Sequence, residues 1–246
     1  MQNPKVILEI CAADLRSAIN AQIGGADRIE LCDNLTAGGT TPSYGIIKLV
    51  RHLLSIDINV LIRPRAGNFI YDDNEFEIMK SDISMCRDLG ADGIVIGILK
   101  ESGDIDFNRV LKLIEIARPM SVTFHRAIDL TVDILGNVLK MMEIGVDRIL
   151  TSGGRNTVYE GRNIIKKMTE IAGEDIIIMP GGGLDLERME EFIKFTGAKE
   201  LHFSAKKLLT DNSKYFNDQM DINKLQGEQY SSDPEIIKNM VSKLKI

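Results

Sequence analysis

The sequence contains little of what marks several large classes of protein. It has only three cysteines among 246 residues, and fewer basic than acidic side chains, 30 Lys and Arg against 36 Asp and Glu. The net charge of −6 argues against nucleic-acid binding, which normally requires a basic surface. Three cysteines, an odd number, indicate free thiols in a reducing compartment rather than a disulfide framework.

Long apolar runs are also absent. None approaches the roughly 20 residues that a helix needs to cross a bilayer. The first ten residues, MQNPKVILEI, lack the basic region, apolar core and small-residue cleavage site of a signal peptide. We therefore expect a cytoplasmic protein that binds neither membranes nor nucleic acids.

What the chain does contain is a pattern that returns four times. GADRIEL, GADGIVI, GVDRILT and GAKELHF begin at Gly25, Gly90, Gly145 and Gly197, and each follows an amphipathic stretch. Glycine suits the end of a helix, where a left-handed backbone conformation causes it little strain. The apolar run after each glycine predicts a strand.

Four further predicted strands lie between these. They are VILEIC from Val6, INVLIRPR from Ile58, SVTFHR from Ser121 and IIIMPGGG from Ile176. Helical patterns separate the eight strands, and this alternation predicts parallel βαβ units. Eight units in a chain of this length predict an α/β fold, the (β/α)8 TIM barrel, as a single domain. An open, doubly wound sheet is the alternative.

The barrel core is assigned to residues 1–207, and residues 208–246 are predicted to complete the same domain with a long polar loop and a C-terminal helix. Aspartates are predicted to cap the helices, at Asp14, Asp133 and Asp185 and, before the last helix, at Asp233. The polar segment from about residue 210 to 233 lacks periodicity. As a long loop it would be a lid, an oligomer contact or a mobile segment.

Alternation within each strand sorts its side chains to two sides. Bulky apolar residues such as Leu8 and Ile10 belong under the outer helices. The alternate residues then point into the barrel, near the carboxyl ends of the strands, where barrel enzymes build their active sites. This inward set comprises Glu9, Cys11, Arg28, Glu30, Cys32, Arg63, Arg65, Thr123, His125, Glu200, His202 and Ser204. Because an unpaired buried charge destabilises a core, we expect the charged members to compensate one another.

Two of the three cysteines stand in matching Glu-x-Cys triplets, which end at Cys11 and Cys32. Neighbouring first and second strands would bring both sulfurs within reach of one ion, and soft thiolates favour Cu(I) or zinc. Simple packing is the alternative, since free cysteine is often buried. No Cys-x-x-Cys motif is present, and Cys86 lies in a helical pattern where we expect it to pack.

A second candidate group consists of Glu9, Glu30, His125 and His202. Carboxylates and imidazoles at strand ends serve as general acids and bases, or hold a harder divalent metal. The alternative interpretation is structural, with each histidine held by a neighbouring carboxylate.

Candidates for anion binding are Arg63, Arg65 and the glycines Gly181, Gly182 and Gly183. The guanidinium fork suits carboxylate or phosphate. A glycine run before a helix exposes N–H groups to an anion, and phosphate sites in barrels often follow strands seven and eight. A buried salt bridge from Arg63 to an inward glutamate and an ordinary turn at the glycines are the alternatives.

Other chemistries find less support in the sequence. No lysine stands at an inward strand end, which argues against a Schiff-base aldolase, and Lys100 is the nearest candidate. No Rossmann fingerprint or P-loop is present, so nucleotide chemistry is not indicated. In FHRAID, Arg126 and Asp129 are expected to pair with each other.

Taken together, these residues resemble the CutC family. The resembling segments are LEICA, GGADRIELCDNLTAGGTTPS, IRPRAGNFIY, GADGIVIGIL, VTFHRAID, GVDRILTSGG, IIIMPGGG and ELHFSA, from residue 8 to about 205. Two small departures are Ile128, where an aromatic residue is expected, and the SGG after the sixth strand. The part beyond residue 207 carries no resemblance.

The resemblance implies a cytoplasmic TIM barrel, usually a homo-oligomer, with a role in copper homeostasis. It makes Cys11 and Cys32 the candidate ligands of Cu(I). The alternative is an enzyme that acts on a small phosphorylated or carboxylated anion by acid–base or divalent-metal chemistry. Buried carboxylates beside the thiols are expected to raise the thiol pKa values.

Overall fold

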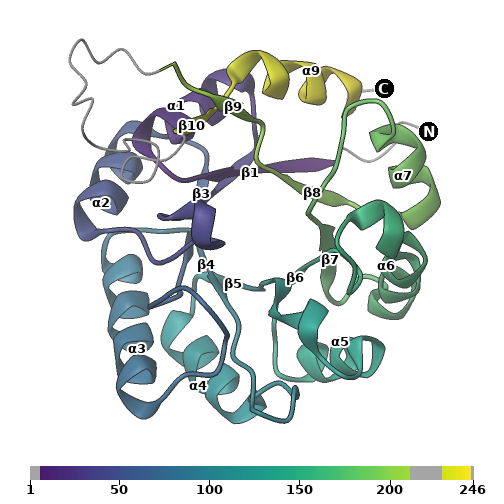
Figure 1. The fold of residues 1–246 in the computed structure, drawn as a ribbon. Helices are drawn as coiled ribbons and strands as arrows, with labels where there is room; N and C mark the ends of the chain where they lie inside the picture. Colours follow the sequence, from purple (N-terminus) through teal and green to yellow (C-terminus); the bar gives the residue numbers. More distant parts are fainter. Residues whose placement is uncertain (1–5, 211–228, 245–246) are drawn as a thin grey trace, which may run out of the picture.

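Eight parallel strands surround a central axis in the computed structural model, which describes residues 6–210 and 229–244 (Figure 1). The sheet order is β7-β6-β5-β4-β3-β2-β1-β8, and a bridge between Gly181 and His202 links the two ends. This confirms the predicted (β/α)8 barrel and excludes the open sheet. The strands are β1 Ile7–Ala12, β2 Arg28–Leu31, β3 Asp57–Leu61, β4 Gly93–Ile96, β5 Ser121–Phe124, β6 Arg148–Thr151, β7 Ile177–Pro180 and β8 Glu200–Phe203.

Helices surround the strands on the outside of the barrel (Figure 1). In the described ranges no helix is long and apolar enough to span a membrane. The helices are α1 Leu15–Gly24, α2 Tyr44–Leu53, α3 Asp73–Asp88, α4 Phe107–Ala117, α5 Ile134–Glu143, α6 Val158–Ala172, α7 Met189–Thr196 and α9 Pro234–Leu244, with short 3-10 turns η1 Leu35–Ala37 and η2 Arg126–Leu130.

Aspartate caps explain where several helices begin. The Asp14 carboxylate accepts the N–H of Ser17, and the Asp133 carboxylate accepts the N–H of Gly136, as predicted. The prediction for Asp185 is wrong, because α7 begins only at Met189. The Asp185 carboxylate instead accepts the Arg188 N–H at 2.8 Å and closes the turn that precedes the helix.

The outward strand residues form the apolar core, and several of the inward ones form an ionic layer. Arg28 lies between two carboxylates, with Nε 2.6 Å from Glu9 Oε2 and Nη2 2.5 Å from Glu200 Oε2. Arg148 Nε lies 2.5 Å from the same Glu200 oxygen. Burial opposes charge on Arg28, but the two carboxylates outweigh it and raise the Arg28 pKa. These buried charges compensate one another.

After β8 the chain continues through a short antiparallel ladder, β9 Lys206–Leu208 with β10 Tyr230–Ser232. The strand β10 lies where a loop was predicted, and residues 211–228 of that predicted loop lie outside the described residues. The Asp233 carboxylate accepts the N–H of Glu235 at 2.8 Å, so the predicted cap of the last helix is confirmed. In Figure 1, α9 lies beside α1 and covers this side of the barrel.

Candidate functional site

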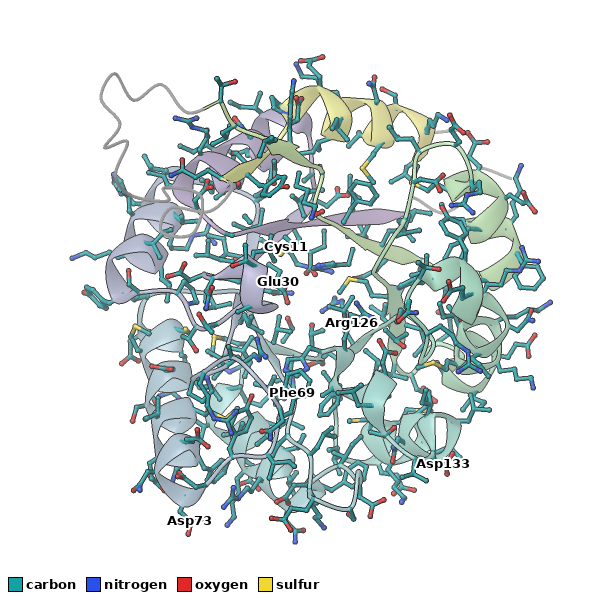
Figure 2. All side chains as sticks on the ribbon, in the orientation of Figure 1. Cys11, Glu30, Phe69, Asp73, Arg126 and Asp133 are labelled. Atoms are coloured by element: carbon teal, nitrogen blue, oxygen red, sulfur yellow. The ribbon has the colours of Figure 1, made fainter. Side chains whose placement is uncertain are left out.

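The two inward cysteines of β1 and β2 lie side by side at the barrel mouth. Cys11 pairs in register with Glu30, and the N–H of Cys32 donates to the carbonyl of Ala12 at the end of β1. Both side chains are buried, and their Sγ atoms are 3.7 Å apart. Figure 2 shows Cys11 and Glu30 close together near the barrel axis. The structure therefore brings the two predicted metal ligands together.

The loop after β2 covers Cys32 through Gly39. This glycine has a φ of +86°, and a Cβ on it would lie 2.7 Å from Cδ2 of Leu61 and 3.8 Å from Sγ of Cys32. Any other residue would be strained and would collide with Leu61. Glycine is thus required for the loop to close over the thiol.

Next to the thiols, His202 lies between two glutamates. Its Nδ1 is 2.8 Å from Glu9 Oε1, and its Nε2 is 3.6 Å from Glu30 Oε2. One ligand atom each from Cys11, Glu30 and His202 lie within 4.8 Å of one another, which is close enough to hold one metal ion. Three of the four predicted acid–base residues, Glu9, Glu30 and His202, are therefore in contact.

The two glutamates differ in their electrostatic environment. Burial favours protonation of Glu9, but Arg28 and His202 outweigh it and hold the Glu9 pKa far below its usual range. Burial, with a further contribution from the Glu9 charge, raises the pKa of Glu30 against the effect of His202. Burial also lowers the pKa of His202, but Glu30 and Glu9 more than reverse this and raise it. The site thus pairs a permanently charged carboxylate with one that can carry a proton.

The Cys11 thiol is held in its protonated form. Its hydrogen bond with Cys32, its burial and the neighbouring Cys32 and Glu30 all raise its pKa. This is the direction expected from buried carboxylates beside the thiols. A soft metal ion would therefore have to displace a proton on binding.

Arg63 lies just after β3, and it makes no ion pair with a glutamate in residues 6–210 and 229–244. Its guanidinium donates to the carbonyls of Ala37 at 3.0 Å and Gly67 at 2.7 Å, and to that of Gly39. The alternative of a salt bridge to Glu9 or Glu30 is thus not realised. Only 4% of Arg63 is exposed, so a buried cation fastens two loops of the barrel mouth together.

Arg65 points away from the barrel interior. Its Nε lies 2.5 Å from Glu75 Oε1, and its Nη2 donates to the carbonyl of Ile70 at 2.7 Å. It is partly exposed and secures the loop before α3. Arg65 therefore pairs with a glutamate of α3 and not with the inward Glu9 or Glu30.

His125 is also separate from the glutamate–histidine group. Its Nδ1 accepts the N–H of Ala127 at 3.1 Å, and its ring packs on Phe69 with 4.6 Å between ring centroids. Burial, together with the charge of Arg63, lowers its pKa to about 3. An imidazole with this pKa is neutral at physiological pH and is a weak base.

The glycine run lies at the mouth but not at a helix N-terminus. Gly182 and Gly183 have φ values of +112° and +76°, and α7 begins six residues later, at Met189. The glycine run therefore does not lead directly into a helix, contrary to the prediction from the sequence. A Cβ on Gly182 would lie 3.1 Å from Arg126 Nη1, so the glycine leaves room for that guanidinium.

Arg126 is a site residue that sequence reasoning did not identify. Its Nε pairs with Asp129 at 2.9 Å, as expected, and its Nη2 donates to the Ser152 hydroxyl at 2.7 Å. The side chain is nevertheless partly exposed and lies near the barrel axis (Figure 2). No pattern in the sequence predicts that Arg126 lies near the barrel axis, because it follows the inward His125 and stands beyond the end of the strand.

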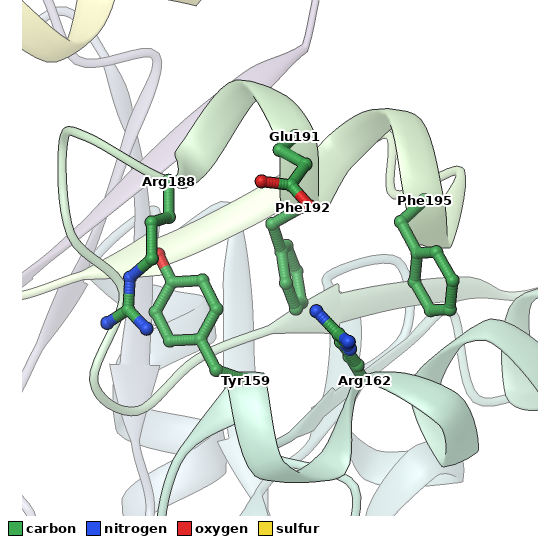
Figure 3. A pocket seen from close by; sticks show the side chains of 6 residues that line it. All are labelled: Tyr159, Arg162, Arg188, Glu191, Phe192 and Phe195. Atoms are coloured by element: carbon green, nitrogen blue, oxygen red, sulfur yellow. The ribbon is translucent and has the colours of Figure 1, made fainter.

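A surface pocket lies between α6 and α7, on the outside of the barrel (Figure 3). Its empty volume, which includes open solvent, is about 350 Å³. Arg188 stacks 3.7 Å from the Tyr159 ring centroid there and also pairs with Asp185. None of the predicted site residues lines it.

Comparison with known proteins identifies close relatives over most of the chain. A model of the CutC family matches residues 6–207. The copper homeostasis protein cutC homolog of Homo sapiens is 42% identical over 211 residues, 86% of this chain and 77% of the human protein. A CutC family protein of Parabacteroides distasonis is 44% identical over 215 residues, 87% of this chain and 88% of that relative.

Solved structures give the same result. A Streptococcus agalactiae protein described as a CutC copper homeostasis protein matches with a TM-score of 0.77 and 36% identity, over 81% of this chain and 98% of that one. More distant barrels share the fold alone. Thiamine phosphate pyrophosphorylase of Pyrococcus furiosus, for example, has a TM-score of 0.59 at 18% identity, over 97% of this chain and 96% of that one.

Proposed function

Because the chain belongs to the CutC family, we propose that it acts in copper homeostasis by binding Cu(I) between Cys11 and Cys32. The separation of 3.7 Å between the two sulfurs is the observation that carries this proposal. Two thiolates on one tetrahedral ion, each at the roughly 2.3 Å typical of zinc, are about 3.8 Å apart. Cu(I) shares the preference for thiolates, so a soft ion fits there without movement of either strand.

The neighbouring groups offer further ligands for the ion. Glu30 and His202 reach the same space as Cys11, so an imidazole or a carboxylate could complete the coordination. The raised pKa of Cys11 means that binding releases a proton. Cu(I) affinity should therefore increase as the pH is raised.

Competition with a chromogenic Cu(I) chelator tests the proposal. The variant Cys11→Ser/Cys32→Ser is expected to lose high-affinity binding because it lacks both soft ligands. Cys86→Ala is the matched control, since Cys86 lies buried in α3, outside the cysteine pair. Equal affinity of the double variant and the wild type would overturn the proposal.

A cytoplasmic location and a homo-oligomeric state complete this proposal. A reducing compartment keeps the buried thiols available for a metal ion. Fractionation of cells and sedimentation of the purified chain measure the two properties directly.

A second candidate function is an enzyme that acts on a small phosphorylated or carboxylated anion. The raised pKa of Glu30, beside His202, whose pKa is also raised, and a charged Glu9, favours it. Active sites often contain neighbouring carboxylates whose pKa values the environment drives apart. Arg126 would supply a positive charge to the substrate's anion, and the glycines 181–183 would supply backbone N–H donors.

Thermal shift with panels of phosphorylated and carboxylated metabolites, followed by turnover assays on the hits, tests this candidate. A metabolite that raises the melting temperature and is converted by the wild type, but not by Glu30→Gln, would support acid–base catalysis. Conversion of the hits at the wild-type rate by Glu30→Gln would exclude that role for Glu30.

A further inference from the structure

His125 is placed in the barrel mouth by a glycine on the neighbouring strand. A Cβ on Gly97, just after β4, would lie 2.2 Å from Cε1 and 2.5 Å from Nδ1 of His125. No other residue fits there, so Gly97 provides the space for the imidazole. The Phe69 ring also packs against the imidazole, and Figure 2 shows Phe69 inside the ring of helices.

The hydrogen bond at Nδ1 determines which tautomer His125 adopts. The N–H of Ala127 donates to Nδ1, so this nitrogen offers its lone pair and carries no proton. In a neutral imidazole the proton is then on Nε2. Burial and Arg63 keep the ring neutral, which makes Nε2–H a hydrogen-bond donor.

Within the described part of the chain, this donor has no acceptor. Nε2 is buried and forms no hydrogen bond with any part of the chain that the structure describes. A buried donor without a partner destabilises the folded state, and such groups call for a functional or ligand-based explanation. An oxygen atom from a bound molecule would satisfy it.

The charge of Arg63 specifies what kind of oxygen this would be. Arg63 is buried, bonded to three backbone carbonyls, and has no carboxylate within ion-pair distance in residues 6–210 and 229–244. It packs against the same aromatic ring as His125, with its guanidinium carbon 5.1 Å from the Phe69 centroid. A buried cation without a counter-charge beside a fixed N–H donor favours a negatively charged oxygen.

We propose that His125 and Arg63 form an oxyanion site that receives a carboxylate or phosphate group of a small metabolite, with Phe69 packed against both side chains. His125 acts there as a neutral donor, and neither copper binding nor the Glu30–His202 pair uses it. The inference deepens the second candidate function, on which it rests, by naming the group that binds the substrate's anion.

Nuclear magnetic resonance of the full-length chain with ¹⁵N-labelled histidine tests the site. Only three histidines are present, so substitution of each one assigns its signals. Inorganic phosphate and malonate, titrated separately, are the probes, and they distinguish phosphate from carboxylate. We expect one of them to shift the His125 Nε2–H resonance saturably while Nδ1 stays unprotonated and the exposed His52 does not respond.

Two substitutions separate the donor from the packing role of the ring. His125→Asn keeps an oxygen near the Nδ1 position for the Ala127 N–H but removes the donor. His125→Gln extends an amide to the Nε2 position. Anion binding at least tenfold weaker in His125→Asn, with a smaller loss in His125→Gln, is the expected result.

The proposal is overturned if neither millimolar phosphate nor millimolar malonate shifts the His125 signals, or if His125→Asn binds the anion as the wild type does. Cu(I) affinity of the His125 variants, unchanged from the wild type, verifies that they are folded. Loss of turnover in Glu30→Gln with the His125 shift intact would separate the acid–base role from the anion site. A saturable shift without any turnover would support the oxyanion site and reject the enzymatic function.

Discussion

At the scale of single residues, one buried carboxylate organises the interior. Glu9 Oε2 accepts from Arg28 Nε at 2.6 Å and from Asn59 Nδ2 at 3.1 Å, while Oε1 lies 2.8 Å from His202. These contacts join β1 to β2, β3 and β8. The charge on Glu9 therefore positions the histidine of the candidate metal site as well as the barrel strands.

Glu9→Gln is expected to lower the free energy of unfolding by about 3 kcal/mol, because it removes one of the two buried carboxylates that face Arg28 and one of the two beside His202. Urea denaturation at neutral pH measures the change. Glu77→Gln is the control, since Glu77 is largely exposed and pairs only with Lys80 on the helix surface, where about 0.5 kcal/mol is expected. A change below about 1 kcal/mol in Glu9→Gln would mean that the ionic layer contributes little.

At the scale of elements, the last helix, α9, packs against α1 on the outside of the barrel. Gly24, the last residue of α1, faces Ile237, and a Cβ on it would lie 2.5 Å from Ile237 Cβ. Ile237 and Met240 of α9 are fully buried. The helix beyond the family match at residue 207 is thus part of the barrel's outer layer.

Gly24→Ala is expected to destabilise the chain by about 1–3 kcal/mol through overpacking against α9, although alanine favours helix by about 1 kcal/mol. Thermal and urea unfolding measure the outcome. Gly45→Ala in α2 is the matched control, because its Cβ would meet only the Ser43 hydroxyl at 3.9 Å. That variant should be neutral or more stable, and equal effects at the two sites would contradict the packing argument.

At the scale of the whole molecule, the buried His125 and the partly buried His202 make the folding stability depend on pH in opposite directions. The His125 pKa is lowered to about 3 by burial and Arg63, so the unfolded chain binds a proton that the folded one does not. Stability is then lost as the pH falls from about 6.5 toward 3. The His202 pKa is raised, so its contribution is complete below about pH 6.5 and is lost as the pH rises through the folded value.

These two linkages predict a stability maximum near pH 6.5. Chemical denaturation between pH 4.5 and 8.5 measures the curve. His125→Asn should flatten its acid side and His202→Gln its alkaline side, while substitution of the exposed His52 should change neither. A flat curve in the wild type would refute the opposed linkages.

Much of the architecture could be predicted because it depends on short-range patterns. The repeated Gly-x-Asp segments located helix ends and strands, and alternation separated core residues such as Leu8 from inward residues such as Glu9. The same repeat also contains two arginines in equivalent positions. Arg148 in GVDRILT occupies the place of Arg28 in GADRIEL, and both arginines bind Glu200.

The sequence by itself determined which residues face the barrel interior, since side-chain alternation in a strand is a local property of the backbone. Only the tertiary structure decided which of them meet. The stagger between strands sets Cys11 beside Glu30 and Glu9 beside His202. The N–H groups of Arg63 donate to loop carbonyls rather than to glutamates. Gly97 leaves the space that His125 occupies, away from the carboxylates. Such contacts join distant parts of the chain, so no local pattern encodes them.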